Sequence, residues 1–320
     1  MVKVVVVEKE PSIFLVVGVL GVIMTIVMTI VILSILGTRL WFMFCIVFIV
    51  ESLALIFFIT YYHKTKKINL MLRQLHSMIR VSGNKIVFPQ SLSVEKGYLE
   101  SIGYWIYTGN TRSYYHKNSF KPLANANVRE INLGRVDENY VVLMNVDESG
   151  YFKIPCVKIV EPEYRDTYIL FLKPCRKTMR ETTISVASGD DVAEARISIE
   201  NGLLKGYLKR IFIGKARSAR LELWGEVKPE SRKIWVRRVL GEVKEGETMV
   251  NERICPSEPI IVIAHEKTLS PRTLCKVFEK QLGVTRPIIL GLGIVEYKAR
   301  LVLDLPFRRD VYKEVVLKTS

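Results

Sequence analysis

The chain has 320 residues, of which 49% are hydrophobic, and a formal net charge of +15. This length accommodates two ordinary domains, or one larger region with a membrane anchor. Basic and acidic side chains balance in residues 1–62, so the positive excess belongs to residues 63–320. A basic surface attracts anionic lipid or nucleic acid, but the absence of zinc-finger spacing and of an RNP1 octamer disfavours a nucleic-acid partner.

Two long apolar runs lie near the start of the chain. No charged residue occurs from Pro11 to Thr38, and Glu51 is the only one from Leu40 to Tyr62. Each run exceeds the roughly 20 residues that a helix needs to cross about 30 Å of hydrocarbon. We therefore expect a short tail at residues 1–10 and a two-helix transmembrane hairpin at 11–62. A pair of buried helices in a protein core is the alternative.

The charges that flank the hairpin predict its orientation. Basic residues cluster after the second run, within residues 63–67, whereas the turn between the runs carries only Arg39. The positive-inside rule places such a basic flank in the cytoplasm. The prediction is a two-pass cell-membrane protein, integral in the lipid bilayer, with its N- and C-termini in the cytoplasm.

Glu51 lies at the centre of the second apolar run, where an ionised acid is costly. Folding the hairpin about Thr38 places Thr25 at the depth of Glu51 and Thr29 one turn away. A protonated Glu51 is expected to bond to Thr25, or to a second copy of itself in a homo-oligomer. Three roles stay open: polar contact between helices, a proton or ion path, and contact with another membrane protein.

Residues 63–84 predict an amphipathic basic connector that continues the second helix and ends at Ser82-Gly83-Asn84. Apolar residues recur at helical spacing, at Ile68, Leu72, Leu75 and Ile79. The basic side chains beside this stripe are candidates for the membrane surface: Lys64, Lys66, Lys67 and Arg73. Packing of this connector on the following domain is the other interpretation.

Residues 85–184 predict a small β-rich domain. Short runs such as "YVVLMNV" and "TYILFLKP" are rich in β-branched and aromatic residues and are separated by turn formers. Tyr114 and Tyr115 lie in an aromatic segment next to Arg112 and Lys117. This segment is a candidate partner-binding loop, and a half-buried hairpin is the plainer interpretation.

Residues 185–320 predict a β-sandwich, because strand-like runs follow the polar break "SVASGDD" at even spacing. One helix is expected at residues 270–283, with Ser270 as its N-cap, Pro271 in its first turn and Gly283 at its end. The predicted fold class is thus a membrane α-helical hairpin plus a mostly-β soluble region whose second part is a sandwich.

A basic stripe follows the first strands of the expected sandwich. Its candidate binding residues are Lys205, Lys209, Arg210 and Arg217. Because alternate residues of a strand share a face, Lys205, Tyr207 and Lys209 are expected to point the same way. Such a face would bind an acidic protein or anionic lipid. The charged surface of a thermostable protein is an equal alternative, and the three glutamines in the chain favour a thermophilic source.

Motifs for catalysis, metals and cofactors are weak throughout. The five cysteines form no CxxC, although similar gaps would allow Cys156–Cys175 and Cys255–Cys275 disulfides. The acidic clusters Asp190-Asp191 and 145–150 are explained by turns, and His265-Glu266 lacks the second histidine of a metalloprotease helix. We expect no metal, no cofactor and no enzymatic activity.

The segment "ENGLLKGYLKRIFIGKARSARLELWGEV" resembles the opening of an arrestin-like domain. "CPSEP" at residues 255–259, together with "GIVEYKARLVLDLPFRRDVYKEVVLKTS", is similar to the ending of that family. The resemblance covers roughly residues 195–320, and the expected helix at 270–283 departs from the family pattern. It implies a sandwich that makes protein contacts, often at membranes, and it transfers no active site.

The functional hypothesis is a membrane-anchored, non-enzymatic scaffold whose β-rich domains bind a protein partner or an anionic lipid surface. An accessory or pore subunit of a transport complex that uses Glu51 is the alternative from another class. A hydrolase with a site assembled from scattered residues ranks last.

Overall fold

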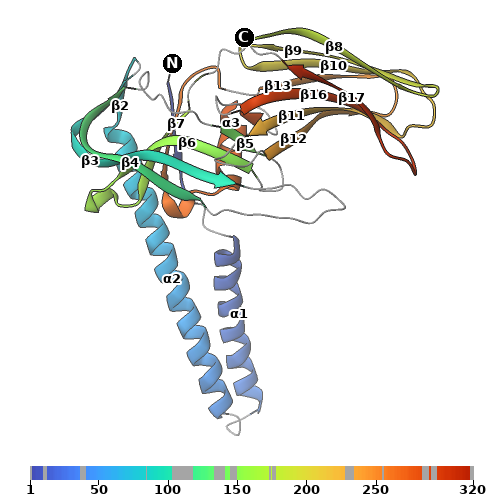
Figure 1. Cartoon of the computed structure of the whole chain (residues 1–320). Helices are drawn as coiled ribbons and strands as arrows, with labels where there is room; N and C mark the ends of the chain where they lie inside the picture. The colour runs from blue at the N-terminus through green and yellow to red at the C-terminus, as the bar shows by residue number, and fades with distance from the viewer. Residues whose placement is uncertain are drawn as a thin grey trace. The chain divides into compact units, whose positions relative to one another are not determined.

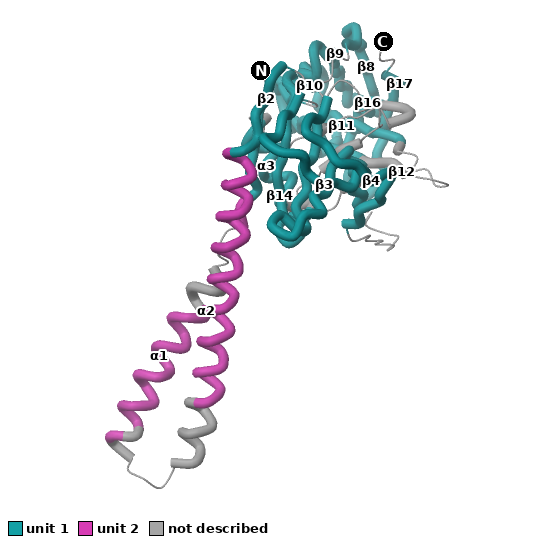
Figure 2. The backbone as a smooth tube through the Cα atoms, turned by 90° about the vertical axis from the view of Figure 1, so that its left-hand side faces the viewer, with its two compact units in different colours: residues 1–7, 78–320 teal, residues 8–77 magenta. Residues whose placement is uncertain are grey.

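The structure is a computed structural model of the chain. It describes residues 2–9, 13–36, 41–83, 85–102, 118–132, 141–144, 150–172, 174, 178–227, 234–253, 256–282, 288–289 and 294–317. Two compact units divide the chain (Figure 2): residues 8–77 form one, and residues 1–7 with 78–320 form the other.

Residues 8–77 are built from two helices, α1 (Ile13–Leu36) and α2 (Trp41–Met78). The helices come close at Gly18, where an added Cβ atom would lie 2.5 Å from Cζ of Phe58. A glycine is needed there because any larger side chain would push against the ring of Phe58. Gly21, one turn further on, has nothing within 4 Å of the position of a Cβ atom.

The predicted transmembrane hairpin is contradicted. Within the described part of the chain, no helix is long and apolar enough to span a bilayer. The helix α2 continues past residue 62 through the basic residues to Met78, as expected for the connector.

Several predictions depended on that hairpin and are wrong with it. They are the membrane class of the fold, the integral lipid bilayer as a partner, and the two-pass location in the cell membrane with both termini in the cytoplasm.

The second half of α2 has the apolar stripe that its spacing indicated. Ile68, Leu72 and Leu75 are buried, while the basic residues beside them are exposed. The helix ends at Met78, several residues earlier than expected, so Ile79 lies outside it. The strand β2 (Arg80–Ser82) follows, and Gly83 turns the chain with a positive φ of 57°.

One sheet of nine strands combines segments that are neighbours in the sequence with segments that are far apart in it (Figure 1). Its path is β1-β14-β7-β6-β3-β2, with β4 paired to β3 and with β5 paired to β6 and β15. The bounds are β1 (Lys3–Val7), β3 (Lys85–Ile102), β4 (Ser119–Asn132), β5 (Val141–Met144), β6 (Gly150–Ile159), β7 (Thr167–Leu172), β14 (Ile260–His265) and β15 (Ile288–Ile289). A short 3₁₀ turn, Pro162–Tyr164, joins β6 to β7.

The centre of this sheet is apolar on both faces. Every residue of β7 and β14 is buried, as expected for strands that read as continuous apolar runs. The strand β1 pairs with β14 in parallel, with Lys3 opposite Ile260 and Val7 opposite Ala264. The predicted tail at 1–10 therefore contains a strand, and β14, which falls in the predicted sandwich range, belongs to this sheet.

The sandwich consists of two antiparallel four-stranded sheets, ordered β13-β10-β9-β8 and β12-β11-β16-β17. The bounds are β8 (Met179–Ser188), β9 (Asp191–Glu200), β10 (Leu203–Phe212), β11 (Ser218–Val227), β12 (Ile234–Val243), β13 (Glu247–Arg253), β16 (Ile294–Asp304) and β17 (Val311–Leu317). The mostly-β class and the sandwich are thus confirmed.

Strict alternation builds the sandwich core. In β9, Ala193, Ala195, Ile197 and Ile199 are buried, and in the facing sheet Leu221, Leu301 and Leu303 belong to the same apolar cluster. The predicted helix is α3 (Pro271–Leu282), and its Leu274 and Phe278 complete this cluster. The Ser270 hydroxyl accepts from the backbone N–H of Thr273 at 3.1 Å, which confirms its role as N-cap.

Candidate functional site

The outer face of the β13-β10-β9-β8 sheet is hollowed. A cavity of about 610 Å³ opens on it, lined by Glu181 of β8, Glu194, Arg196, Ile197 and Ser198 of β9, Lys205, Gly206, Tyr207, Lys209 and Ile211 of β10, and Met249 of β13. We call this surface the groove face. Alternation along β10 turns Lys205, Tyr207 and Lys209 away from the core, as the sequence predicted.

Strand register arranges the groove face in rows. Tyr207 of β10 lies between Arg196 of β9 and Met249 of β13, and Lys209 lies between Glu194 and Glu247. An aromatic and a thioether side chain thus lie side by side on β10 and the edge strand β13, with charged groups before and after them along the strands. Met249 is 76% exposed and Ile211 is 43% exposed, which is unusual for apolar residues on neighbouring strands.

The charged groups of the groove face are paired only loosely. The Lys205 ammonium lies 3.1 Å from Glu200, that of Lys209 lies 3.8 Å from Glu247, and the Arg196 guanidinium lies 3.1 Å from Glu194. The lysines and Glu200 and Glu247 are each about half exposed or more. Pairs of this kind contribute about 0–1 kcal/mol to stability. A ligand can therefore exchange them at little cost.

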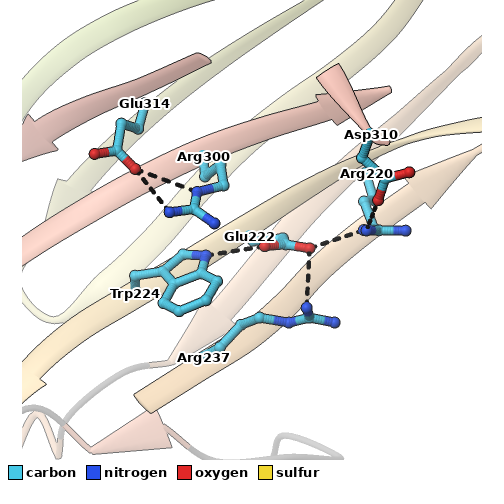
Figure 3. A network of polar contacts seen from close by, with 7 residues as sticks. All are labelled: Arg220, Glu222, Trp224, Arg237, Arg300, Asp310 and Glu314. Carbon is cyan, nitrogen blue, oxygen red and sulfur yellow. Dashed lines mark hydrogen bonds and ion pairs between the residues drawn. The ribbon is translucent and has the colours of Figure 1, made fainter. Parts of the chain in front are cut away.

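The opposite outer face, on the β12-β11-β16-β17 sheet, is closed by its own side chains (Figure 3). The Glu222 carboxylate is 1% exposed, accepts hydrogen bonds from Trp224 Nε1 at 2.9 Å and Arg220 Nε at 2.8 Å, and lies 3.7 Å from Arg237 Nη1. We call this surface the network face. Three side chains, Arg220, Trp224 and Arg237, thus place donor groups around the carboxylate of Glu222.

The network continues across the sheet to its edge. Register places Arg300 opposite Glu222 on one side and opposite Glu314 on the other. Arg300 donates to Glu314 through Nε at 3.2 Å and Nη2 at 2.8 Å, and its guanidinium lies 4.2 Å from the Trp224 ring centre. The hydrogen bonds from Arg300 lower the pKa of Glu314. Burial disfavours the Arg220 cation, but bonds to Glu222 and Asp310 outweigh it and raise its pKa.

The predicted binding residue Arg210 is not on the groove face. Its side chain is 2% exposed and pairs with Asp191, which also accepts backbone N–H groups of Gly214 at 2.8 Å and Ala216 at 2.7 Å. Burial opposes ionisation of Asp191, but these hydrogen bonds lower its pKa overall. The pair anchors the β10–β11 connection. Alternation along β10 already places Arg210 on the inner face, with Leu204, Gly206 and Leu208, because Lys205, Tyr207 and Lys209 share the outer one.

Among the described residues, no hydrogen bond joins the polar residues that were predicted at the centre of the helices. Glu51 is 8% exposed, and its Oε2 atom has no hydrogen-bond partner among the described residues. The Thr25 hydroxyl donates to the carbonyl of Gly21 at 2.8 Å, one turn back on its own helix. Thr29 is half-buried on the same helix.

The remaining predicted residues are dispersed. Lys64, Lys66 and Lys67 are exposed, and Arg73 donates through Nη2 to Glu8 at 2.8 Å. This bond lowers the pKa of Glu8. Arg217 is exposed, and its guanidinium lies 5.8 Å from the ring centre of Phe307. Tyr114 and Tyr115 lie outside the described residues.

Among the described residues, the cysteines and the potential metal ligands do not form a reactive centre. Cys275 on α3 is a free thiol whose pKa is raised by burial, while Cys175 and Cys255 lie outside the described residues. His265 caps a 3₁₀ turn by accepting the Lys267 N–H at 3.1 Å. Among the described residues, no three potential ligands are grouped closely enough to hold a metal ion.

No protein-family model and no curated protein matches the chain. Among solved structures it is similar to squid arrestin, with 8% sequence identity, a TM-score of 0.30, and coverage of 75% of this chain and 95% of that chain. The predicted resemblance to an arrestin-like fold is confirmed at this weak level, and no residue role follows from it.

Proposed function

We propose that the chain is a non-enzymatic binding protein whose groove face holds a segment of a protein partner. The observation that carries this proposal is the 610 Å³ hollow, to which all four strands of one sheet contribute side chains. A hollow with an apolar centre and a few polar groups is typical of a binding site. Here the apolar part of the lining includes Tyr207 and Ile211 of β10 and Met249 of the edge strand β13.

The side chains of the groove face indicate which kind of partner segment would bind there. Alternate residues along a strand are separated by roughly 6.6–6.8 Å, so Lys205 and Lys209 lie on either side of Tyr207 along β10. A partner segment with an apolar side chain over Tyr207 and Met249, and carboxylates near the two lysines, complements this layout. The exposed Glu200 and Glu247 would then give up their loose contacts to the lysines.

The network face is a poorer candidate, because its groups already satisfy one another. Displacing Arg220 or Arg237 from Glu222 would remove one of the few donors around a buried carboxylate. A partner would have to compensate several kcal/mol for that loss. No observation on the described residues favours the transport alternative based on Glu51.

Capture experiments with the full chain test the proposal. We expect proteins that bind the wild-type chain in an extract to be lost with the double variant Tyr207→Ala/Met249→Asp. The matched control is Val316→Asp, which places a charge at a 46% exposed apolar site on the other outer face. Equal loss with the control, or retention by the double variant, contradicts the assignment of the groove face.

A further inference from the structure

Four turns meet at one end of the sandwich, and two of them carry exposed apolar side chains. Phe307, in the β16–β17 turn, is 100% exposed, and Phe212 and Ile213, where β10 ends, are 62% and 53% exposed. Isolated exposed apolar residues are ordinary, but two phenylalanines and an isoleucine on adjoining turns are not. We call the region formed by these turns, at 189–190, 213–217, 244–246 and 305–310, together with Phe212 at the end of β10, the turn end.

Hydrogen bonds show that these turns are neighbours. The N–H of Arg217 donates to the carbonyl of Asp304 at 2.8 Å, and the N–H of Arg210 donates to Gly246 at 3.0 Å. Asp191, just after the β8–β9 turn, accepts from Gly214 and Ala216. Figure 1 shows the β8–β9 and β16–β17 turns at the same end of the two sheets.

The backbone presents Phe307 to solvent at an energetic cost. Its φ is 60°, in the left-handed region that glycine and asparagine adopt most readily. A phenylalanine there gains no burial in return, since its side chain is fully exposed. Strain held at an exposed aromatic residue points to a contact made outside the chain.

Positive charge surrounds the apolar residues. The basic residues of the turn end are Lys215, Arg217, Lys244, Arg308 and Arg309, and the acidic ones are Asp190, Glu245 and Asp310. Asp310 is already paired with Arg220 of β11. Within the described residues, Lys215, Arg308 and Arg309 make no ion pair, so their charge is available to a ligand.

We propose that the turn end docks on an anionic lipid headgroup layer. Phe212, Ile213 and Phe307 enter the boundary between headgroups and acyl chains, and the arginines and lysines around them contact the headgroups. This contact is peripheral and reversible, and no helix has to cross the bilayer. A fluid headgroup layer accepts side chains that project from separate turns, whereas a folded protein would need matching pockets for each.

This docking would place the bound partner at a lipid surface. Ile211 lines the groove face and Phe212, the next residue, belongs to the turn end. The chain would then act as an adaptor between a protein segment and anionic lipid. The lipid contact does not depend on the groove, so either proposal can fail alone.

A local fluorescence measurement tests the lipid contact directly. The full-length Phe307→Trp variant is mixed with vesicles of phosphatidylcholine containing brominated phosphatidylserine, and the wild-type spectrum is subtracted. We expect a blue shift and quenching of the added tryptophan. The control is Leu123→Trp on β4, which replaces another exposed apolar residue, and it should show neither change. Equal spectra for the two variants overturn the proposal.

The charge dependence supplies a second, independent test. Each basic residue near an anionic surface contributes about 1 kcal/mol, or roughly fivefold in affinity. In the Phe307→Trp background, Arg308→Gln/Arg309→Gln should raise the half-saturating lipid concentration about 25-fold. The matched control Lys96→Gln/Lys313→Gln, on exposed strand positions, should leave it unchanged.

Two results would overturn the electrostatic part of the proposal. One is equal binding to pure phosphatidylcholine vesicles, and the other is equal weakening by the control pair. Folding is not at risk in the apolar variants, because Phe307→Asn relieves a left-handed backbone strain and removes no buried surface. That variant should keep its unfolding temperature and lose lipid binding.

Discussion

The two outer faces of the sandwich have similar residue types and opposite organisation. On the network face, Glu222 is 1% exposed and surrounded by Arg220, Arg237 and Trp224. On the groove face, Lys205 and Lys209 each contact one exposed glutamate, and the Tyr207 hydroxyl donates to one of these, Glu247, at 3.1 Å. Charged residues thus stabilise one sheet internally and leave the other ready for a ligand. The presence of charged residues does not by itself identify a binding surface. A surface is available to a ligand when its charged groups are only loosely paired with one another.

The largest expected effect is a difference in stability between a variant of the network face and a variant of the groove face. Glu222→Ala leaves the donors of Arg220, Arg237 and Trp224 without their acceptor, and we expect the free energy of unfolding to fall by about 3–4 kcal/mol. Glu194→Ala on the groove face, which removes one partly exposed pair with Arg196, should cost no more than about 1 kcal/mol. Chemical denaturation of the two variants checks this, and equal losses would remove the distinction.

The buried Asp191–Arg210 pair predicts how stability depends on pH. Asparagine at position 191 keeps one acceptor but loses the charge, so Asp191→Asn should cost about 2–3 kcal/mol near neutral pH. The pKa of Asp191 is lowered in the folded chain from its ordinary 3.8. Its contribution is therefore fully present above pH 3.8 and is lost as the pH falls through the lower folded value.

Denaturation measured across this pH window checks the sign of the effect. The stability difference between the wild type and Asp191→Asn should shrink as the pH falls below 3.8. A difference that grows on acidification would contradict the lowered pKa of Asp191.

A smaller effect is expected at the edge of the network face. Glu314→Gln weakens the bonds from Arg300 and Lys298. Because the Glu314 side chain is 34% exposed, solvent screening limits the cost to about 1 kcal/mol or less. Thermal unfolding should show a small decrease that high salt reduces. A loss as large as that of Glu222→Ala would mean that the network is one cooperative unit up to its edge.

The smallest stability effect should come from the groove face itself. Lys209→Gln removes a 3.8 Å contact to Glu247 and should change the free energy of unfolding by no more than about 0.5 kcal/mol. Partner capture should nevertheless decrease, because the lysine flanks Tyr207. Unchanged capture with unchanged stability would exclude Lys209 from the binding surface.

Local sequence patterns predicted many features of the β-rich region, but not which strands pair with each other. Alternation placed Lys205, Tyr207 and Lys209 on one face, and the Ser270-Pro271 signal identified the start of α3. The pairing of β1 with β14 joins residues more than 250 positions apart, and no local pattern encodes such a partner. The length of the two apolar runs likewise predicted a membrane hairpin, but none of the described helices is long and apolar enough to cross a bilayer.

The candidate site was predictable only in part. The basic stripe indicated β10 as a binding strand, but it included Arg210, which alternation places on the inner face of β10, where it pairs with Asp191. Met249 gave no signal, because its importance comes from its position opposite Tyr207 in a neighbouring strand. Phe307 was recognisable only once its exposure and positive φ were known.

Site-specific photocrosslinking tests the central claim most directly. A photoreactive amino acid at position 249 in the full chain should form discrete protein adducts in cells, and Tyr207→Ala should remove them. The same probe at position 316, on the opposite sheet, should form none. Identical adducts at both positions, or none at 249, would contradict the account of the groove face as a protein-binding surface.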